Sequence, residues 1–214
     1  MPNLSSTIVA SDELARVSAQ WIADRLRDEL AAGKKRASLA LAGGTTPREV
    51  HEALARENVP WENVHVYFGD ERCVPPDHPD SNYRMAKESL LDRVPIPPEN
   101  VHRPNAEASD REGAARAYEE ELPDTIDVLV LGIGEDGHTA SLFPGSPAIA
   151  EETRRYVAVV GPKAPPERLT ITPVALALEG DWDPSTTPAQ LARKGYWVLD
   201  TGAAGALRAP DSMR

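Results

Sequence analysis

Carboxylate and imidazole side chains gather in the segment DVLVLGIGEDGHTASLFPG, residues 127–145. Histidine is the side chain best matched to proton transfer near neutral pH. Glu135, Asp136 and His138 are therefore the first candidates for a catalytic site. Each of them alone also fits an ordinary solvated turn or a surface position. Their grouping at one point of the chain favours acid–base chemistry.

An apolar run from Val128 to Leu131 precedes these side chains and predicts a buried strand. In open α/β sheets, ligands bind beyond the carboxyl ends of the strands, which is where this group falls. Gly132, Gly134 and Gly137 permit a tight turn or close approach of a ligand to the backbone. Without a third correctly spaced glycine, GxG is a weak signal for a dinucleotide site.

A second candidate site is the segment GGTTP, residues 43–47, which follows an apolar run at 37–42. The pattern predicts a strand, a turn and a helix through about Ala55, with Thr46 as N-cap and Pro47 as the first helical residue. Free backbone N–H groups, two hydroxyls and the positive end of the helix dipole would form an anion cradle. An ordinary strand-to-helix turn is the alternative. The pattern GxxxxGK[ST] is absent, so this is not a Walker nucleotide loop.

Polar residues also follow a third predicted strand, Val64 to Phe68, in the segment GDER at 69–72. The proline-rich loop at 74–81 contains two aspartates and a histidine. Three ligands within one such loop favour a solvated loop, and no metal site is predicted. Cys73 has no evident histidine partner nearby, so it fits a small buried hydrophobe better than a nucleophile.

The remaining pattern alternates helices and strands. Residues 11–30 form an amphipathic helix with Ser11 as its capping residue and Gly33 at its end. Further expected elements are a short strand at 7–10, a helix at 109–122, strands at 156–160, 169–172 and 196–199, and a terminal helix at 202–207. We expect one α/β domain over residues 1–214, with a mostly parallel, Rossmann-like sheet flanked by helices.

The composition restricts the partners. The chain has 214 residues, a formal net charge of −11 and one cysteine. Nucleic acids and anionic membranes need a basic face, so neither is expected as a partner. No early segment resembles a signal peptide and no apolar run reaches membrane-spanning length, so we expect a cytoplasmic protein. We also expect a monomer or a weak homodimer.

Taken together, these loops resemble the 6-phosphogluconolactonase family, within the superfamily that also contains glucosamine-6-phosphate deaminases. The matching segments are LAGGTTP at 41–47, FGDER at 68–72, SNYR at 81–84, GIGEDGHTASLFPG at 132–145 and PKAPPERLTIT at 162–172. The resemblance implies the deaminase/isomerase-type α/β fold. It also implies hydrolysis of a small sugar phosphate lactone, 6-phospho-D-glucono-1,5-lactone, in the oxidative pentose phosphate pathway, without an obligatory metal or organic cofactor.

On this interpretation His138 is the general base, and it later protonates the ring oxygen that leaves. Asp136 or Asp70 orients the imidazole or binds sugar hydroxyls. Backbone N–H groups near residues 43–44 or 134–137 supply oxyanion donors, each contributing about 3 kcal/mol. Candidates for binding the phosphate and the rest of the substrate are Gly43, Gly44, Thr45, Thr46, Arg72, Asn82, Gly137, Lys163 and Arg168. Ser141 lies close to His138 but not in a G-x-S-x-G elbow, and no covalent nucleophile is required.

Two other functions remain possible on this scaffold. Related deaminases generally carry a glutamate five residues after the histidine, where this chain has Phe143, which favours a lactonase. A non-catalytic sugar-phosphate sensor would be expected to lack the proton-transfer residue, whereas His138 is present.

One part of the sequence departs from the family pattern. ALEG at 177–180 follows residues 172–176 at once, where the family pattern usually has another strand and helix. Either a sheet unit is absent or residues are missing from the sequence. We favour missing residues, because deletion of a strand and helix would expose apolar surface along the sheet.

Overall fold

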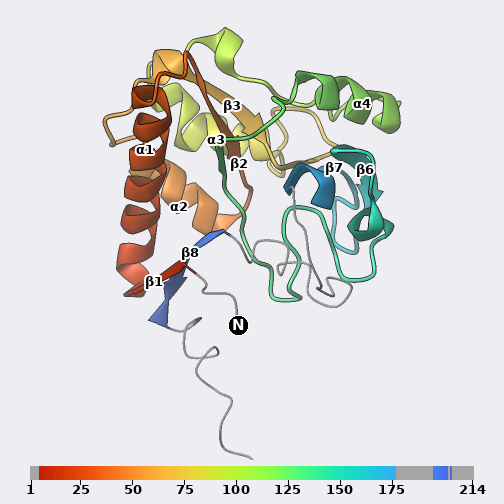
Figure 1. Cartoon of the computed structure of the whole chain (residues 1–214). Coiled ribbons are helices and arrows are strands. Elements are labelled where there is room, and N and C mark those ends of the chain that lie inside the picture. The colour runs from red at the N-terminus through yellow and green to blue at the C-terminus, as the bar shows by residue number, and fades with distance from the viewer. Residues whose placement is uncertain (1–4, 177–194, 202, 204–214) are drawn as a thin grey trace, which may run out of the picture.

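The computed structural model describes residues 5–176, 195–201 and 203 (Figure 1). Its strands are β1 (Ser5–Val9), β2 (Ala37–Leu41), β3 (Val64–Phe68), β4 (Asp70–Arg72), β5 (Val128–Leu129), β6 (Tyr156–Val160), β7 (Glu167–Ile171) and β8 (Tyr196–Asp200). The α-helices are α1 (Leu14–Ala31), α2 (Thr45–Leu54), α3 (Asn82–Ser89) and α4 (Arg111–Glu121). Short 3-10 helices occupy Ser11–Glu13, Trp61–Asn63, Leu91–Arg93, Pro98–Asn100, Pro147–Ala150 and Pro173–Leu176.

Parallel pairing organises the first part of the chain. β2 lies between β3 and β5 and is parallel to both, with Leu39 opposite Val66 on one side and Val128 on the other. β1 and β8 form a separate parallel pair. The predicted α/β class with a mostly parallel sheet and flanking helices is confirmed. The strand predicted over Val128 to Leu131 is shorter, since β5 ends at Leu129.

A three-stranded antiparallel sheet, in the order β4-β7-β6, was not predicted. The polar residues 70–72 have no side-chain pattern that predicts a strand. They form β4 because the backbone of β7 pairs with them. Gly69 joins the two sheets: its N–H donates to Leu41 O (2.9 Å), and its carbonyl accepts the N–H of Ile171 (2.8 Å). The backbone of this one residue therefore links the parallel and the antiparallel sheets.

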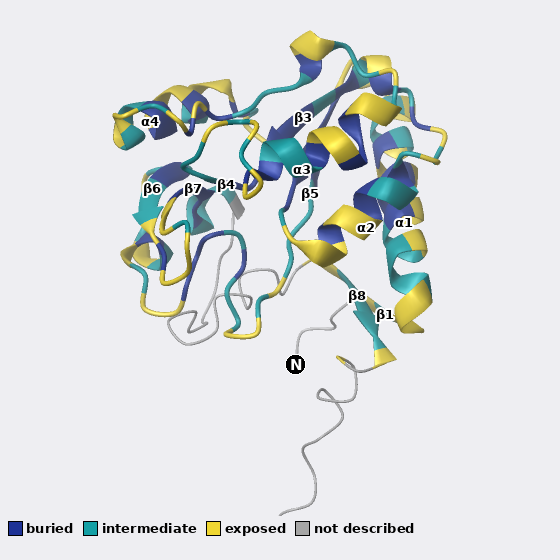
Figure 2. Ribbon diagram, turned by 180° about the vertical axis from the view of Figure 1, so that it is seen from behind, coloured by how far each residue is buried: buried dark blue, intermediate teal, exposed yellow. Residues whose placement is uncertain are grey.

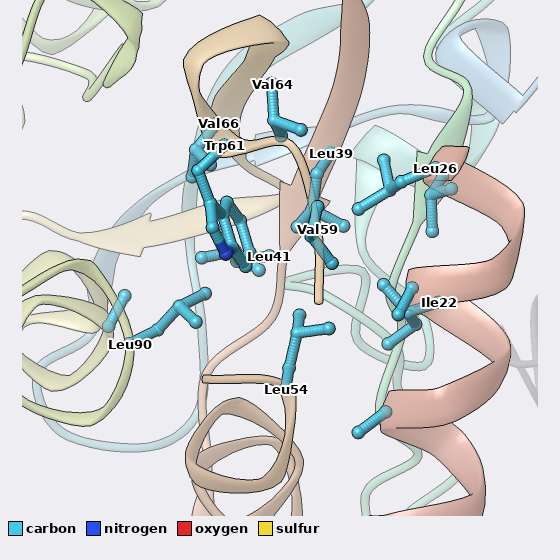
Figure 3. Packing of buried hydrophobic residues seen from close by; sticks show 14 of the residues in the cluster. Ile22, Leu26, Leu39, Leu41, Leu54, Val59, Trp61, Val64, Val66 and Leu90 are labelled. Carbon is cyan, nitrogen blue, oxygen red and sulfur yellow. The ribbon is translucent and has the colours of Figure 1, made fainter. Parts of the chain in front are cut away.

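The main apolar core lies between β2, β3 and the helices α1, α2 and α3 (Figure 3). Ile22 and Leu26 lie one turn apart on α1 and face Leu39 of β2, as the helical spacing of apolar residues predicted. Burial of each such side chain contributes about 1.5–3 kcal/mol. Figure 2 shows β3 as largely buried, β1 and β8 as intermediate or exposed, and exposed residues along the outer faces of the helices.

Helix ends refine the expected boundaries. Ser11 was predicted as a capping residue, but it begins a 3-10 turn and makes no capping hydrogen bond. Gly33, with φ of 97°, follows the end of α1 and donates to Leu30 O (3.1 Å), as expected for a C-terminal glycine. At α4, Asp110 caps the helix by accepting the N–H of Gly113 (2.9 Å).

A second core cluster fastens α4 to both sheets. Tyr118 of α4 packs edge-on against Tyr156 of β6, with ring centroids 4.8 Å apart. The Tyr118 hydroxyl accepts the N–H of Phe68 (2.8 Å) and donates to His102 O (3.0 Å). The segment 177–180 and most of the predicted helix 202–207 lie outside the described residues. Within the described part of the chain, no helix is long and apolar enough to cross a membrane.

Candidate active site

Three loops meet beyond the carboxyl ends of β2, β3 and β5. A Cβ atom on Gly43 would lie 1.9 Å from Asn82 Oδ1, so the amide of Asn82 touches the loop after β2. A Cβ atom on Gly132 would lie 3.9 Å from Pro47 Cγ, which brings the loop after β5 against the start of α2. The strand-end site predicted from the sequence is therefore assembled from these segments.

The start of α2 presents free backbone donors. Thr46 was predicted as the N-cap, but α2 begins at Thr45 and Gly44 is the cap residue. Gly44 has φ of 111°, a conformation that glycine adopts readily and that ends the extended strand without a side-chain cap. Because no side chain caps this helix, the N–H groups of its first turn remain available to an anion.

A tight turn after β5 orients the imidazole of His138. The N–H of Gly134 donates to His138 O (2.9 Å), and the N–H of Gly137 donates to Gly134 O (2.9 Å). A Cβ atom on Gly134 would lie 2.0 Å from His138 Cε1, so only glycine leaves room for the ring. These two N–H groups are engaged within the turn, so the candidate oxyanion donors are residues 43–44 and, within the turn, residues 135 and 136.

Asp136 fixes the imidazole. Its Oδ1 is paired with His138 Nδ1 and also accepts the backbone N–H of His138 (3.3 Å). The hydrogen bond from His138 lowers the pKa of Asp136, which keeps the carboxylate ionised. An ionised carboxylate holds the proton on Nδ1 and leaves the lone pair on Nε2, as a general base requires. The His138 side chain is 20% exposed, so water can reach it.

Asp70 occupies a different position. It is 5% exposed, and its carboxylate accepts hydrogen bonds from Ser141 Oγ (2.6 Å) and Asn82 Nδ2 (3.1 Å). Of the two acids considered as orienting groups, Asp136 is thus the one that contacts the imidazole. Ser141 was considered only as a nucleophile, and its contact with Asp70 spans 71 residues of sequence. No sequence pattern near either residue indicates this contact.

The neighbouring Glu71 is structural. Its carboxylate accepts the backbone N–H groups of Asn82 (2.7 Å) and Tyr83 (2.8 Å) and the hydroxyl of Ser81 (3.1 Å). Burial raises the pKa of Glu71, and these donors oppose that shift. Glu71 therefore anchors the start of α3 and with it the amide of Asn82.

Arg72 and Arg168 are direct cross-strand partners on β4 and β7. Arg168 is 6% exposed and donates to the carbonyl oxygens of Pro165 (3.1 Å) and Lys163 (3.3 Å). Burial and the charge of Arg72 lower the pKa of Arg168. Among the described residues, neither arginine forms an ion pair, and the buried Nε of Arg72 has no hydrogen-bond partner. Two adjacent uncompensated guanidinium groups favour binding of a multivalent anion.

Phe143 contacts both His138 and Arg168. Its ring centroid lies 4.7 Å from that of His138, and Arg168 Cζ lies 5.5 Å from the same phenyl ring. Lys163 Nζ lies 4.0 Å from Asp136 Oδ2. Within the described residues, no hydrogen bond connects Thr45 or Thr46 to Arg168. Glu135 is exposed and forms no hydrogen bond or ion pair with the imidazole.

Cys73 is a partly buried packing residue. It lies against the second core cluster, and burial raises the pKa of its thiol to about 11. A thiol that remains protonated at neutral pH is a poor nucleophile, which agrees with its interpretation as a small hydrophobe.

Known proteins share this architecture. The family described as glucosamine-6-phosphate isomerases/6-phosphogluconolactonase matches residues 10–178. The chain is 47% identical over 145 residues to a 6-phosphogluconolactonase of Synechocystis sp., an alignment covering 63% of this chain and 60% of that protein. It is 35% identical over 220 residues to the 6-phosphogluconolactonase of Streptomyces coelicolor, with coverage of 82% and 84%.

Solved structures agree with these sequence relatives. The 6-phosphogluconolactonase of Thermotoga maritima superposes with a TM-score of 0.78 at 26% identity, covering 93% of this chain and all of the other. The chain spans about 60% of the length of the cyanobacterial relatives from Synechocystis and Nostoc.

Proposed function

Because the chain belongs to the family of glucosamine-6-phosphate isomerases and 6-phosphogluconolactonases, we propose that it hydrolyses 6-phospho-D-glucono-1,5-lactone to 6-phosphogluconate. This is the second step of the oxidative pentose phosphate pathway. The observation that carries the proposal is the Asp136–His138 pair, connected through Phe143 to the uncompensated charge of Arg168. A base and an anion-binding group are what hydrolysis of a phosphorylated lactone needs.

Hydrolysis proceeds by addition and elimination at the lactone carbonyl. His138 Nε2 takes a proton from water as the water oxygen bonds to C1, and the carbonyl electrons move onto oxygen. The tetrahedral intermediate then collapses, the bond between C1 and the ring oxygen breaks, and His138 returns its proton to that oxygen. Asp136 keeps the imidazole in one tautomer and stabilises its charged form. No covalent intermediate is required.

The developing oxyanion needs preorganised donors. The backbone N–H groups of Gly43 and Gly44 are suited to this role, because those of Gly134 and Gly137 are engaged inside their own turn. One well-placed donor of this kind contributes about 3–4 kcal/mol to stabilisation of the transition state. Asn82, which donates to the carbonyl of Asp70 (2.9 Å), keeps its loop against Gly43.

Arg72 and Arg168 bind the phosphate, with Lys163 and the first turn of α2 at Thr45 and Thr46 as further donors. The proposal is supported by the absence of any carboxylate paired with either arginine among the described residues. In a chain of net charge −11, such a local positive site is needed to attract an anionic substrate.

Isomerisation or deamination of an amino sugar phosphate is less well supported. Phe143 occupies the place of the deaminases' ring-opening glutamate, and it is 3% exposed and packed on His138. An apolar ring cannot transfer a proton to a sugar ring oxygen. The presence of phenylalanine at this place therefore favours lactone hydrolysis, with His138 as the proposed proton-transfer residue.

The decisive experiment measures hydrolysis of freshly generated 6-phosphogluconolactone above its spontaneous rate. We expect the native protein to accelerate hydrolysis and His138→Ala to lose at least about 100-fold of that acceleration while still binding 6-phosphogluconate. His78→Ala removes an exposed histidine from a different loop and serves as the control. If the native protein binds 6-phosphogluconate but does not accelerate hydrolysis, it is a sensor and the enzymatic proposal is refuted.

We further propose that a single domain over residues 1–214 carries the activity in the cytoplasm, as a monomer or a weak homodimer. The acidic net charge supports a chain that does not associate with nucleic acids or anionic membranes. Light scattering coupled to size-exclusion chromatography measures the oligomeric state directly.

A further inference from the structure

A cavity of about 260 Å³ opens at the amino-terminal ends of β2 and β3. Its lining includes Arg36, Ser38, His65, Tyr67 and Asp124. The candidate active site lies at the carboxyl ends of the same strands, so the two sites lie at opposite edges of the parallel sheet. The proposed lactonase chemistry uses none of the residues that line this cavity.

One wall of the cavity is rigid and aromatic. The ring of Tyr67 stacks on His102 with centroids 4.6 Å apart and planes 9° apart. His102 is in turn held by a hydrogen bond between its Nε2 and His65 Nδ1 (2.9 Å). Because these three rings fix one another, the wall needs little reorganisation to receive a ligand.

Tyr67 brings an unused donor to this wall. The residue is 5% exposed, and its hydroxyl has no hydrogen-bond partner among the described residues. Because it is not one of the fully buried polar atoms that lack a partner, this hydroxyl is accessible and free to donate to a partner outside the protein. The cavity is the place from which that partner can come.

Arg36 supplies an uncompensated positive charge at the same place. Its guanidinium forms no hydrogen bond or ion pair within the described part of the chain. Arg36 is an exposed residue that lines the cavity together with His65 and Tyr67. Burial and the charge of Arg36 lower the pKa of His102. The second cation of the lining, Lys34, is already paired with Asp127 and Glu29.

The acid beside Lys34 is equally satisfied. The carboxylate of Asp127 accepts the backbone N–H of Ser38 (2.8 Å) and its hydroxyl (2.9 Å), besides pairing with Lys34. Asp124 is the remaining acid of the lining and is exposed to solvent. The available groups are therefore a guanidinium and a phenol hydroxyl, and both are donors.

We propose that this cavity is a second ligand site, which binds a small oxyanion through Arg36 and Tyr67. Guanidinium binds phosphate and carboxylate oxygens in pairs, and the tyrosine hydroxyl donates to a third oxygen. The cavity accommodates the oxyanion group of a metabolite. The carboxylate of Asp124 repels an anion at the rim of the cavity, so removal of its charge should tighten binding.

The test is a pair of titrations of the full-length, ¹⁵N-labelled protein, one with inorganic phosphate and one with malonate. The amide signals of Ser38 and Tyr67 report this cavity, whereas those of Thr45 and Thr46 report the candidate active site. We expect saturable shifts at Ser38 and Tyr67. Tighter binding of phosphate would identify a phosphoryl ligand, and tighter binding of malonate a carboxylate ligand.

Variants decide whether the proposed donors hold the ion. Arg36→Gln is expected to weaken binding at Ser38 about tenfold or more, as loss of a charge-assisted hydrogen bond does. Tyr67→Phe is expected to weaken it by a smaller factor, and Asp124→Asn to tighten it. Arg56→Gln makes the same change of net charge at an exposed residue away from the cavity and is expected to have no effect.

Two results would overturn the proposal. The first is a set of shifts at Ser38 and Tyr67 that do not saturate. The second is unchanged affinity in Arg36→Gln, which would identify an adventitious ion only. Neither result bears on the proposed lactonase, since Arg36→Gln is expected to hydrolyse the lactone at the native rate. Loss of lactonase activity in the native protein would likewise leave the titration interpretable.

Discussion

Replacement of Gly134 by alanine tests the geometry of the proposed base without altering any ionisable group. A Cβ atom at this position would lie 2.0 Å from His138 Cε1 and 2.1 Å from His138 Nδ1. Real Cβ contacts are not that short, so the imidazole must move. The atoms that move include the nitrogen paired with Asp136 Oδ1. The substitution therefore separates His138 from the group that fixes its tautomer.

The magnitude follows from the role of the displaced ring. A positioned general base contributes about 10²–10⁴ to the rate, so we expect Gly134→Ala to lower kcat for lactone hydrolysis by about 100-fold or more. KM should change far less, because the arginines that we propose to bind the phosphate lie on β4 and β7. The assay is the initial rate of hydrolysis above the spontaneous rate, measured over a range of substrate concentrations.

Gly132→Ala is the matched control in the same loop. Its added Cβ would lie 3.9 Å from the nearest atom, Pro47 Cγ, which is an ordinary van der Waals contact. We expect this variant to retain nearly native kcat. Native kcat in Gly134→Ala would refute the reasoning, because an imidazole displaced from Asp136 could not then be the base. Equal losses in both variants would also refute it, since they would point to the loop as a whole.

Three further predictions concern polar side chains. Burial lowers the pKa of His51 from 6.5 to about 4, so between these pH values the unfolded chain binds a proton that the folded chain does not bind. The contribution of His51 to the free energy of unfolding should therefore be fully present above pH 6.5 and fall by about 3 kcal/mol as the pH drops to 4. Urea titrations of the native protein and of His51→Leu should show this fall only in the native protein. Ser141→Ala removes the 2.6 Å hydrogen bond to the buried carboxylate of Asp70 and should lower the free energy of unfolding by about 1.5–3 kcal/mol in urea titrations, whereas an unchanged value would mean that water replaces the hydroxyl. Asp136→Asn should lower kcat by about 100-fold or more with little change in KM, because an amide no longer fixes the tautomer of His138 or stabilises its charge, and native kcat in this variant would contradict that role.

Local features of the site were predictable from the sequence. Asp136 and His138 are two residues apart in a glycine-rich turn, so their pairing depends only on the turn itself. The strand-to-helix loop at 43–47 also lies where its composition indicates. The exact start of α2 was not predictable from the threonines, because Gly44 reaches its cap conformation through backbone freedom instead of a side-chain hydrogen bond.

Features that depend on distant pairing were not predictable in this way. Arg72 and Arg168 were candidates individually, but their position opposite each other requires the register of β4 and β7. The sequence of β4 has no apolar alternation, so it resembles a loop until its partner strand is known. The contact of Ser141 with Asp70 has the same origin, since β4 and β7 must first form the surface on which the loop rests.

The junction at Gly69 relates the proposed base, His138, to the two arginines proposed to bind the phosphate. The base belongs to the loop after the parallel strand β5, whereas Arg72 and Arg168 stand on the antiparallel sheet. Gly69 is hydrogen-bonded through its N–H to Leu41 and through its carbonyl to Ile171, and so connects these two sheets. The backbone positions of the two arginines relative to His138 therefore depend on this residue. In the proposed reaction, the backbone therefore limits which ligands fit, through the distance between the phosphate and the reacting carbon.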